Sequence, residues 1–373
     1  MALTGIQIFK LLPKTNCGEC GVPTCLAFAM NLATGKAELS ACPYVSEEAK
    51  AQLQEASAPP IRPVPIGIGD RALKVGGETV MFRHEKRFEN PPGLAILIKD
   101  TMEDSEVDAK LDRFKQLQYE RVGLNLRPEL VAVKEESGDA GKFEALVNKV
   151  KQNSDGSIIL MSDNPDILAA GVKACADRKP LIYAATKDNL ESVANLAKEN
   201  SCPLAAKASG LEELADLTTK LTEAGINDIV IDSGARTVHQ AFEDQVIIRN
   251  AALAGKFRPL GFPTIVFPGE MTDDPMKEAV IASMFVAKYG GIIVLSDFQG
   301  ESLFPLLVER LNIYTDPQRP LATTEGIYEI GNPDANSPVL VTTNFSLTYF
   351  IVSGEIEASK VPSYLLVMDT EGL

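Results

Sequence analysis

The chain has 373 residues, of which 45% are apolar and 23% charged, which is the composition of an ordinary folded protein with two or three domains. Its net charge of −15 disfavours nucleic-acid binding, which depends on basic surfaces, and no apolar run approaches the ~20 residues of a membrane span. Only two histidines, His84 and His239, are available for catalysis or metal binding.

The first informative feature is a group of four cysteines, Cys17, Cys20, Cys25 and Cys42, spaced C-x2-C-x4-C-x16-C-P. Four thiolates can complete the coordination of one metal centre. Zinc sites usually show two C-x2-C pairs or a mixture of Cys and His. A clustered run with a distant Cys-Pro favours a 4Fe–4S cluster. Zinc and disulfides remain the alternatives.

Residues 1–57 form the predicted cysteine module. We expect helices over 6–12 and 24–32, with Cys25 near the start of the second, and a module that needs its metal for stability. Met1 to Lys14 lacks the basic and apolar regions of a secretory signal, so we expect a cytoplasmic protein with reduced thiols. The two other cysteines, Cys175 and Cys202, read as buried small hydrophobes.

A proline-rich linker follows over residues 58–69 and is expected to be extended and semi-rigid. Residues 71–86 alternate in polarity, and Gly76-Gly77 predicts a hairpin turn within them. Residues 58–92 are therefore interpreted as linker and hairpin.

Residues 93–325 repeat one pattern, in which a short apolar run precedes a stretch of helical period. Continuous apolar strands separated by helices predict a buried parallel sheet, and eight such units predict an α/β fold of the (β/α)8 (TIM) barrel type. A doubly wound open sheet is the alternative. The predicted strands are 94–98, 130–133, 158–161, 181–184, 204–206, 229–231, 264–267 and 292–295.

The carboxyl ends of barrel strands are where active sites lie. Asp232 and Asp297 at these ends suggest a paired acid and base, but Asp after a strand is also an ordinary helix N-cap. We assign no catalytic residue and expect the barrel to act as a docking scaffold. The other strand-end residues are Asp100, Glu135, Ser162, Asp163, Lys207, Ser233, Gly269, Glu270 and Ser296.

Residues 326–373 begin a third, α/β domain of Rossmann-like type. The pattern predicts a strand at 339–343, a helix within 344–358 and a strand at 363–369. Two strands and one helix cannot close a domain, so we expect this domain to be incomplete here.

The whole layout resembles the large (gamma) subunit of the corrinoid iron–sulfur protein of the reductive acetyl-CoA (Wood–Ljungdahl) pathway. The motifs that carry the resemblance are C-G-E-C-G-x-P-T-C near the start, V-T-T-N-F-S-L-T-Y-F at 341–350, and L-L-V-M-D-T-E-G-L at the end.

The resemblance implies a methyl carrier of the methyltransferase class. A methyltransferase passes methyl from methyltetrahydrofolate to Co(I) of a bound corrinoid (a cobalamin-type cobamide), acetyl-CoA synthase/CO dehydrogenase accepts it, and the 4Fe–4S cluster reactivates Co(II). The small corrinoid protein subunit completes a heterodimer.

The resemblance also assigns the cofactor residues. Cys17, Cys20, Cys25 and Cys42 would ligate the cluster. This chain has no D-x-H-x-x-G motif to supply an imidazole ligand, which would make the cobalt easier to reduce. The residues that would line the corrinoid are Leu340, Thr342, Thr343, Asn344, Ser346, Thr370, Glu371, Gly372 and Leu373.

Two other functions stay open. One is a stand-alone iron–sulfur enzyme that acts at the barrel mouth, which turnover without corrinoid would reveal. The other is a zinc module on a scaffold barrel, which iron analysis would eliminate.

Overall fold

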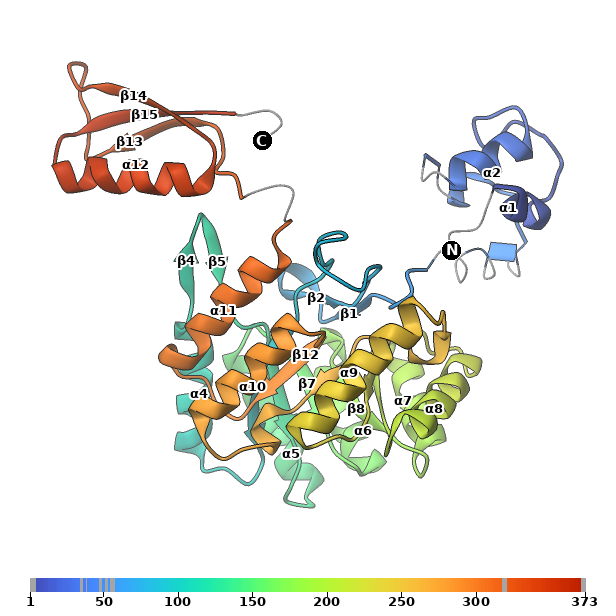
Figure 1. The fold of residues 1–373 in the computed structure, drawn as a ribbon. Coiled ribbons are helices and arrows are strands. Elements are labelled where there is room, and N and C mark those ends of the chain that lie inside the picture. Colours follow the sequence, from blue (N-terminus) through green and yellow to red (C-terminus); the bar gives the residue numbers. More distant parts are fainter. Residues whose placement is uncertain are drawn as a thin grey trace. The chain divides into compact units, whose positions relative to one another are not determined.

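The computed structural model describes residues 5–33, 36–37, 39–46, 49–50, 53, 58–316 and 321–369 (Figure 1). The chain divides into two compact units, Met1–Pro59 and Pro60–Leu373. Within the described residues, no helix is both long enough and apolar enough to cross a membrane.

The second unit is built on eight parallel strands that follow one another around a ring, which confirms the barrel over the open sheet. The ring closes between β10 (Ile229–Asp232) and β11 (Ile265–Val266) through a parallel bridge from Ile231 to Thr264, where the Ile231 N–H donates to the Pro263 carbonyl at 2.9 Å. In ring order the strands are β3 (Gly93–Lys99), β6 (Leu130–Lys134), β7 (Ser157–Met161), β8 (Leu181–Ala185), β9 (Leu204–Lys207), β10 (Ile229–Asp232), β11 (Ile265–Val266) and β12 (Ile292–Leu295).

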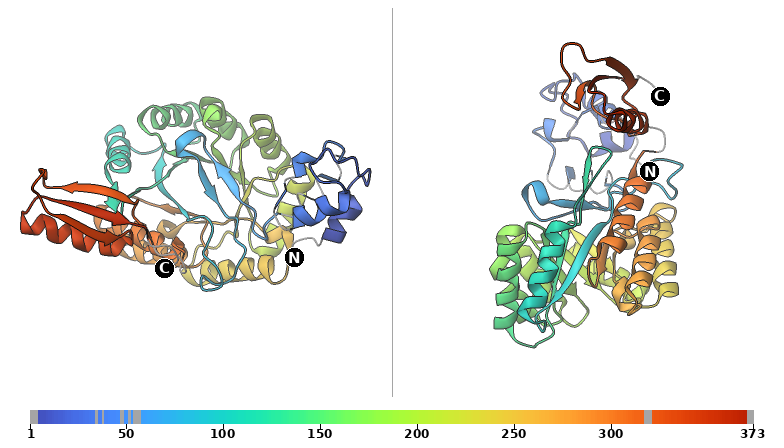
Figure 2. Two further views of the ribbon diagram at one scale, coloured as in Figure 1. Left: turned by 90° about the horizontal axis from the view of Figure 1, so that it is seen from above. Right: turned by 90° about the vertical axis from the view of Figure 1, so that its left-hand side faces the viewer.

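A helix follows each barrel strand and packs on the outside of the ring (Figures 1 and 2). Several begin at side-chain caps: Asp139 accepts from the N–H groups of Gly141 and Lys142, and Asn164 and Asp274 act in the same way. The helices are α4 (Asp104–Gln116), α5 (Ala140–Asn153), α6 (Pro165–Cys175), α7 (Leu190–Asn200), α8 (Leu211–Glu223), α9 (Val238–Leu253), α10 (Pro275–Ala287) and α11 (Gly300–Tyr314).

Short elements complete the barrel unit. An antiparallel pair, β4 (Tyr119–Arg121) and β5 (Leu124–Leu126), extends between α4 and β6. Single 3-10 turns are η2 (Gly69–Arg71), η3 (Ala176–Arg178), η4 (Arg258–Leu260) and η5 (Pro268–Glu270).

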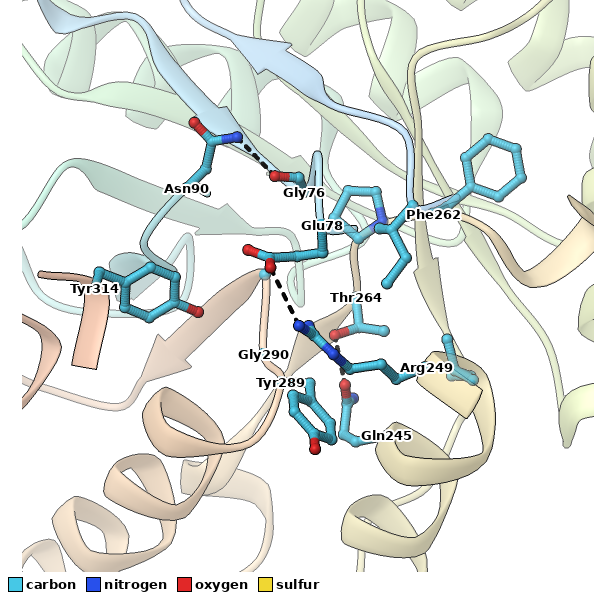
Figure 3. Close-up of a pocket in the computed structure, with 14 residues that line it drawn as sticks. Gly76, Glu78, Asn90, Gln245, Arg249, Phe262, Thr264, Tyr289, Gly290 and Tyr314 are labelled. Carbon is cyan, nitrogen blue, oxygen red and sulfur yellow. Dashed lines mark hydrogen bonds and ion pairs between the residues drawn. The ribbon is translucent and has the colours of Figure 1, made fainter. Parts of the chain in front are cut away.

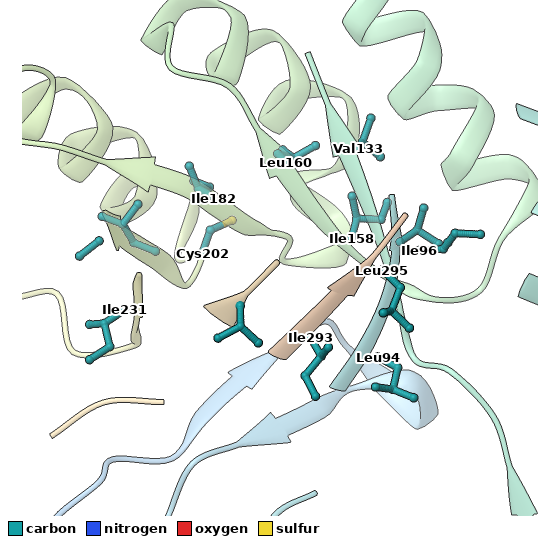
Figure 4. Packing of buried hydrophobic residues seen from close by; sticks show 14 of the residues in the cluster. Leu94, Ile96, Val133, Ile158, Leu160, Ile182, Cys202, Ile231, Ile293 and Leu295 are labelled. Atoms are coloured by element: carbon teal, nitrogen blue, oxygen red, sulfur yellow. The ribbon is translucent and has the colours of Figure 1, made fainter. Parts of the chain in front are cut away.

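The barrel strands are buried on both faces, which is why their sequences read as continuous apolar runs. Outward side chains such as Leu160, Ile182 and Ile293 pack against the helices (Figure 4). Inward positions include the small Ala95 and Ala132 and form a second cluster inside the ring. Each fully buried Leu or Ile stabilises the fold by about 1.5–3 kcal/mol relative to an exposed one.

A hairpin of β1 (Val64–Ile66) and β2 (Leu73–Val75) closes the amino end of the barrel. Val64, Ile66 and Val75 are completely buried in the inner cluster. Ser157, the first residue of β7, donates through Oγ to the Ile66 and Arg71 carbonyls at 3.3 and 3.0 Å. The hairpin therefore belongs to the barrel core and leaves only the carboxyl end open.

The hairpin corrects two sequence predictions. Its first strand lies inside the segment predicted to be an extended linker, and Gly76-Gly77 follows β2 instead of forming the turn. The turn is made by residues 67–72, where Gly67 and Gly69 have φ angles of +83° and +63°. Residues other than Gly seldom adopt such angles.

Residues 321–369 contain a small sheet of order β13-β15-β14 with one helix against it. The predicted strands and helix are confirmed as β14 (Val339–Thr343), α12 (Ser346–Ser359) and β15 (Ser363–Met368), and an unpredicted strand, β13 (Gly326–Ile330), pairs antiparallel to β15. Leu365, Val367 and Ile356 form its small core.

The first unit contains α1 (Gly5–Leu11), α2 (Cys25–Ala33) and a 3-10 turn, η1 (Leu39–Ala41). Both predicted helices are confirmed. Ile8, Leu12 and Phe28 form its core together with two of the cysteines, Cys25 and Cys42.

We expect Gly76→Ala to destabilise the barrel much more than Gly123→Ala. Both glycines have positive φ, +79° and +72°, so each substitution forces Ala into the left-handed region, at about 1 kcal/mol. Only at Gly76 would the new Cβ overlap a main-chain atom, the Arg62 carbonyl oxygen, whereas nothing lies within 4 Å at Gly123. The total at Gly76 should reach about 3 kcal/mol in urea unfolding. Equal losses would contradict this packing.

Candidate cofactor sites

The four clustered cysteines lie in and around the loop between the helices of the first unit. Cys17 and Cys20 belong to the loop, Cys25 is the first residue of α2, and Cys42 directly follows η1. Cys25 and Cys42 are buried, Cys20 is half-buried and Cys17 is exposed. All six thiols of the chain are free, so the structure gives the disulfide alternative no support.

The loop is tied to the start of α2. The Asn16 side chain accepts from the Cys25 N–H at 2.8 Å, and the Asn16 N–H donates to Cys25 Sγ at 3.4 Å. Gly18 and Gly21 have φ angles of +80° and +83°, and the Gly21 N–H donates to the Gly18 carbonyl. The chain thus turns tightly around the thiols, with an N–H group already directed at one sulfur.

Tyr44 lies close to two of the cysteines. Its hydroxyl donates to Glu19 Oε1 at 2.8 Å, and this bond, together with the nearby Cys17 and Cys42, raises the pKa of Tyr44. Among the residues that the structure describes, no three His, Cys, Asp or Glu side chains stand close enough to hold a metal ion. The fit to a cluster therefore rests on the donor set, four free thiols, and on the hydrogen-bonded loop that carries two of them and is tied to a third.

A second candidate site is the turn that joins β14 to α12. Thr342 and Ser346 are buried, and Thr343 and Asn344 are half-exposed at the carboxyl edge of the small sheet. Ser346 accepts from Thr323 Oγ1 at 3.3 Å, and the Asn344 amide donates to Asp369 Oδ1 at 2.8 Å. Four of the predicted corrinoid residues, Thr370, Glu371, Gly372 and Leu373, lie outside the described residues.

The N-cap residue of α12 is Phe345, and no side chain caps the first turn. The Ser346 N–H donates to the Leu321 carbonyl at 2.9 Å, which leaves the next N–H groups of the turn for a ligand. Free N–H groups at the start of a helix bind anionic or polar oxygen groups. Apolar side chains surround the turn: Leu340 is 40% exposed and Leu347 is 63% exposed. A ligand here would meet both polar and apolar groups.

The third candidate is the open, carboxyl end of the barrel. Asp232 is buried at the end of β10 and accepts from the Tyr183 hydroxyl at 2.5 Å, from the Gly234 N–H at 2.8 Å and from both Nη atoms of Arg236. Burial, followed by the charge of Asp232, raises the pKa of Tyr183 well above its usual range. Arg236 also pairs through Nε with Glu270, and its guanidinium stacks on Phe267.

Sequence reasoning misjudged the aspartates of this end. Asp232 and Asp297 do not act as a pair, because Asp297 accepts two hydrogen bonds from Arg113 on α4, at 3.0 and 2.7 Å. Neither is the N-cap of a helix. Each is neutralised by its own arginine. The pairing of Asp232 with Arg236 had one signal in the sequence, the spacing of four residues between them. The contact of Tyr183 with Asp232 had no signal in the sequence.

A cavity of about 330 Å³ opens above this network and is lined by Lys134, Glu135, Met161, Ser162, Asp163, Tyr183, Lys207, Gly234, Arg236 and Glu270. Its polar groups largely bind one another: Ser162 donates to Glu135 at 2.9 Å, and Lys134 pairs with Glu136 at 3.1 Å. Polar groups that already bind one another are poorly placed to exchange protons with a substrate, so this end of the barrel suits a scaffold better than an active site.

Comparisons with known proteins cover both the cysteine loop and the β14–α12 turn. A family model described as CO dehydrogenase/acetyl-CoA synthase delta subunit matches residues 63–373, and an Fe-S cluster model matches residues 12–44. The chain is 47% identical to the corrinoid/iron-sulfur protein large subunit of Moorella thermoacetica, over 100% of this chain and 83% of that protein. It is 39% identical to the acetyl-CoA decarbonylase/synthase complex subunit gamma of Methanopyrus kandleri, over 100% and 82%.

Among solved structures, a dihydropteroate synthase from Coxiella burnetii in complex with pteroic acid is similar over 68% of this chain and 100% of its own, with 12% identity and a TM-score of 0.47.

We expect Asp232→Asn to cost about 3 kcal/mol of unfolding free energy, because it leaves Arg236 beside an uncharged buried group. Asp163→Asn is the matched control at the same mouth. Asp163 is 83% exposed and lies 3.6 Å from Lys207, so its loss should change stability by less than about 0.5 kcal/mol. Denaturant unfolding of both variants measures this, and similar losses would refute the buried network.

Proposed function

The chain belongs to the family of corrinoid/iron-sulfur protein large subunits, and from this premise we propose that it carries methyl groups on a bound corrinoid for acetyl-CoA synthesis. One observation carries the proposal. The match to that family is continuous, and it includes both the segment with four free thiols and the strand-to-helix turn that no side chain caps. We propose the division expected from sequence: cluster module 1–57, linker and hairpin 58–92, barrel 93–325 and corrinoid-binding part 326–373.

Cys17, Cys20, Cys25 and Cys42 are the proposed ligands of a 4Fe–4S cluster. The Asn16 N–H directed at Cys25 Sγ is the kind of hydrogen bond that stabilises cluster sulfur. Cys25 at the start of α2 places a positive helix end beside an anionic group. The two left-handed glycines let the main chain pass close to a cluster without a Cβ in the way.

The corrinoid is proposed to lie against the turn between β14 and α12, lined by Leu340, Thr342, Thr343, Asn344, Ser346 and the segment Thr370 to Leu373. A corrin ring is an apolar disc with polar side arms. The exposed Leu340 and Leu347 offer apolar contact, and the uncapped N–H groups of α12 offer donors to the arms. Binding between a strand end and a helix start follows the general rule for α/β sheets.

When bound, the two groups would supply the chemistry: the corrinoid would accept methyl from methyltetrahydrofolate by way of a methyltransferase and pass it to acetyl-CoA synthase, and the cluster would supply the electron that restores oxidised cobalt. The chain's own residues hold, orient and shield these groups. His84 precedes β3 and His239 is on α9 of the barrel, so neither belongs to the β14–α12 turn. This supports a cobalt held without a histidine of this chain.

The proposed partners are the small corrinoid protein subunit, the methyltransferase, and acetyl-CoA synthase/CO dehydrogenase. The small sheet leaves Val339, Val341 and Leu347 about two-thirds exposed, which is unusual for a soluble surface and supports a partner there. With a net charge of −15, acidic partners would be repelled unless they dock through specific patches.

The stand-alone barrel enzyme remains the second candidate, because the mouth cavity of about 330 Å³ could hold a small molecule. The saturated polar network below it disfavours this function. Turnover of a substrate by the chain without corrinoid would establish it.

The cluster assignment predicts that Cys20→Ser lowers bound iron and the cluster EPR signal to background, and abolishes reductive reactivation. Methyl transfer from pre-reduced cobalt should stay intact, because the cysteine module is a separate unit from the barrel and small sheet. Cys202→Ser is the control: this thiol is buried in the barrel, which raises its pKa to about 11, and its loss should leave iron unchanged.

If Cys20→Ser lost methyl transfer as well, the cluster would be a folding element instead of an electron relay. Zinc in place of iron in the wild-type protein would support the zinc module.

The corrinoid and partner assignment predicts that Leu347→Asp weakens binding of the small subunit together with corrinoid by at least about tenfold. Leu347 is 63% exposed at the turn, so the fold should tolerate the charge. Val361→Asp is the control, since Val361 is 50% exposed just before β15, at the opposite end of the small sheet. Calorimetric titration measures binding of the small subunit by each variant, and corrinoid absorbance measures retained corrinoid. If the two variants lost the same affinity, the corrinoid site would not be at the turn.

A further inference from the structure

Asn16, the residue just before the first cysteine, is bonded to the third cysteine through both its side chain and its main chain. Its side-chain oxygen Oδ1 accepts from the Cys25 N–H at 2.8 Å, and its own N–H donates to Cys25 Sγ at 3.4 Å. The two bonds run in opposite directions between residues nine positions apart in sequence. Asn16 therefore fixes Cys25 relative to Cys17, although it is not itself a proposed ligand.

The backbone of Asn16 adopts a conformation that suits few residue types. Its φ angle is +50°, in the left-handed region, where Asn and Asp occur more often than other residues apart from Gly. Gly at this position would offer no acceptor to the Cys25 N–H, and Asp would offer one together with a negative charge. Asn combines the conformation, the acceptor and a neutral side chain.

The Cys25 N–H is one of the donors at the start of α2. The first N–H groups of a helix have no partner within it and carry partial positive charge. At α2 two of them are taken by side-chain oxygens: Asn16 Oδ1 accepts from Cys25, and Thr24 Oγ1 accepts from Ala27 at 3.1 Å. These two donors are therefore directed at oxygen instead of at a cysteine sulfur.

Donors directed at sulfur matter for an iron–sulfur cluster, because hydrogen bonds to the sulfurs help to set its reduction potential. Reduction makes the cluster more negative, and a donor stabilises the more negative state, so each added donor raises the potential. In the proposed function the cluster gives one electron to Co(II), which becomes Co(I) while the cluster is oxidised. This transfer needs a cluster of low potential.

We propose that Asn16 is a positioning residue that keeps the cluster a strong reductant. Its side chain withholds the Cys25 N–H from sulfur, while its main-chain N–H holds the Cys25 thiol in place. The inference rests on the proposed function. Because the two bonds come from different parts of one residue, substitutions at position 16 can remove the side-chain bond and leave the main-chain bond intact.

The first test is Asn16→Gly in the complete complex with cluster, corrinoid and small subunit. Gly adopts a positive φ without strain and keeps the main-chain N–H, so only the acceptor is lost. The freed Cys25 N–H, and water that takes the place of the amide, would donate to sulfur. The equilibrium constant for reduction of the cluster should therefore rise roughly tenfold, which is about 59 mV for a one-electron couple.

Redox titration followed by the EPR signal of the reduced cluster measures this potential without any turnover. Thr15→Gly is the matched control. Thr15 is the exposed neighbour of Asn16, and its replacement adds the same chain freedom but leaves the acceptor of the Cys25 N–H in place. Its potential and its bound iron should match those of the wild-type protein.

The second test, Asn16→Asp, should shift the potential in the opposite direction. Asp tolerates the left-handed region and keeps an acceptor for the Cys25 N–H. Its carboxylate adds a negative charge beside the cluster, so the equilibrium constant for reduction should fall roughly tenfold. Bound iron should stay at the wild-type level in both variants, because the four cysteines and the main-chain bond to Cys25 remain.

Three results would overturn the inference: a potential that is unchanged or lower in Asn16→Gly, a potential that is unchanged or higher in Asn16→Asp, or loss of iron from Asn16→Gly. The last result would show that the side chain is needed to assemble the cluster instead of to set its potential. If the wild-type protein held no iron and gave no reduced-cluster signal, the proposed function would fail instead, before any variant is compared.

Discussion

The structure depends on the closure of one parallel sheet into a ring. An open parallel sheet would leave two rows of main-chain groups unpaired, and closure removes both edges. The closure is narrow: β11 has two residues, and the seam includes the Ile231–Thr264 bridge and the bond from the Ile231 N–H to the Pro263 carbonyl. Once closed, the ring is filled from within by its own side chains and by the β1–β2 hairpin. The barrel interior is therefore filled by side chains, and the proposed cofactor sites lie on the parts attached to it, the cysteine module and the small sheet.

Arginines join the outer helices of the barrel to its strands and loops. Arg249 joins α9 to the loop that contains Glu78 (Figure 3), Arg310 joins α11 to Glu129 and to the Pro92 carbonyl before β3, and Arg113 joins α4 to Asp297 after β12. Buried ion pairs contribute little net stability, because desolvation offsets much of their attraction. Their value here is geometric. A planar group with several donors fixes two segments in register, and each of these arginines joins segments far apart in sequence.

The sequence was sufficient to predict helices and strands whose own residues determine their secondary structure. All eight barrel strands were predicted because burial on both faces makes each one continuously apolar. It was insufficient where the deciding contact is distant. Val64-Pro65-Ile66 reads as linker, yet it is a strand because Val64 and Ile66 fill the barrel end while Pro65 faces outward. Strand β13 was missed because only alternate residues are half-buried. Asp297 gave no sign of its arginine, because Arg113 lies on α4, 184 residues away in sequence. For Asp232 the only sign was the four-residue spacing to Arg236. The four cysteines were found from spacing alone, but their role as ligands stays a prediction.

A rigid barrel with cofactors on its attachments answers a conflict in the proposed function. The corrinoid must meet a methyl donor, a methyl acceptor and an electron source, and a site inside a rigid barrel mouth could face only one of them. A site on the small sheet, where Val339, Val341 and Leu347 are about two-thirds exposed, offers a surface that more than one of these proteins can contact in turn.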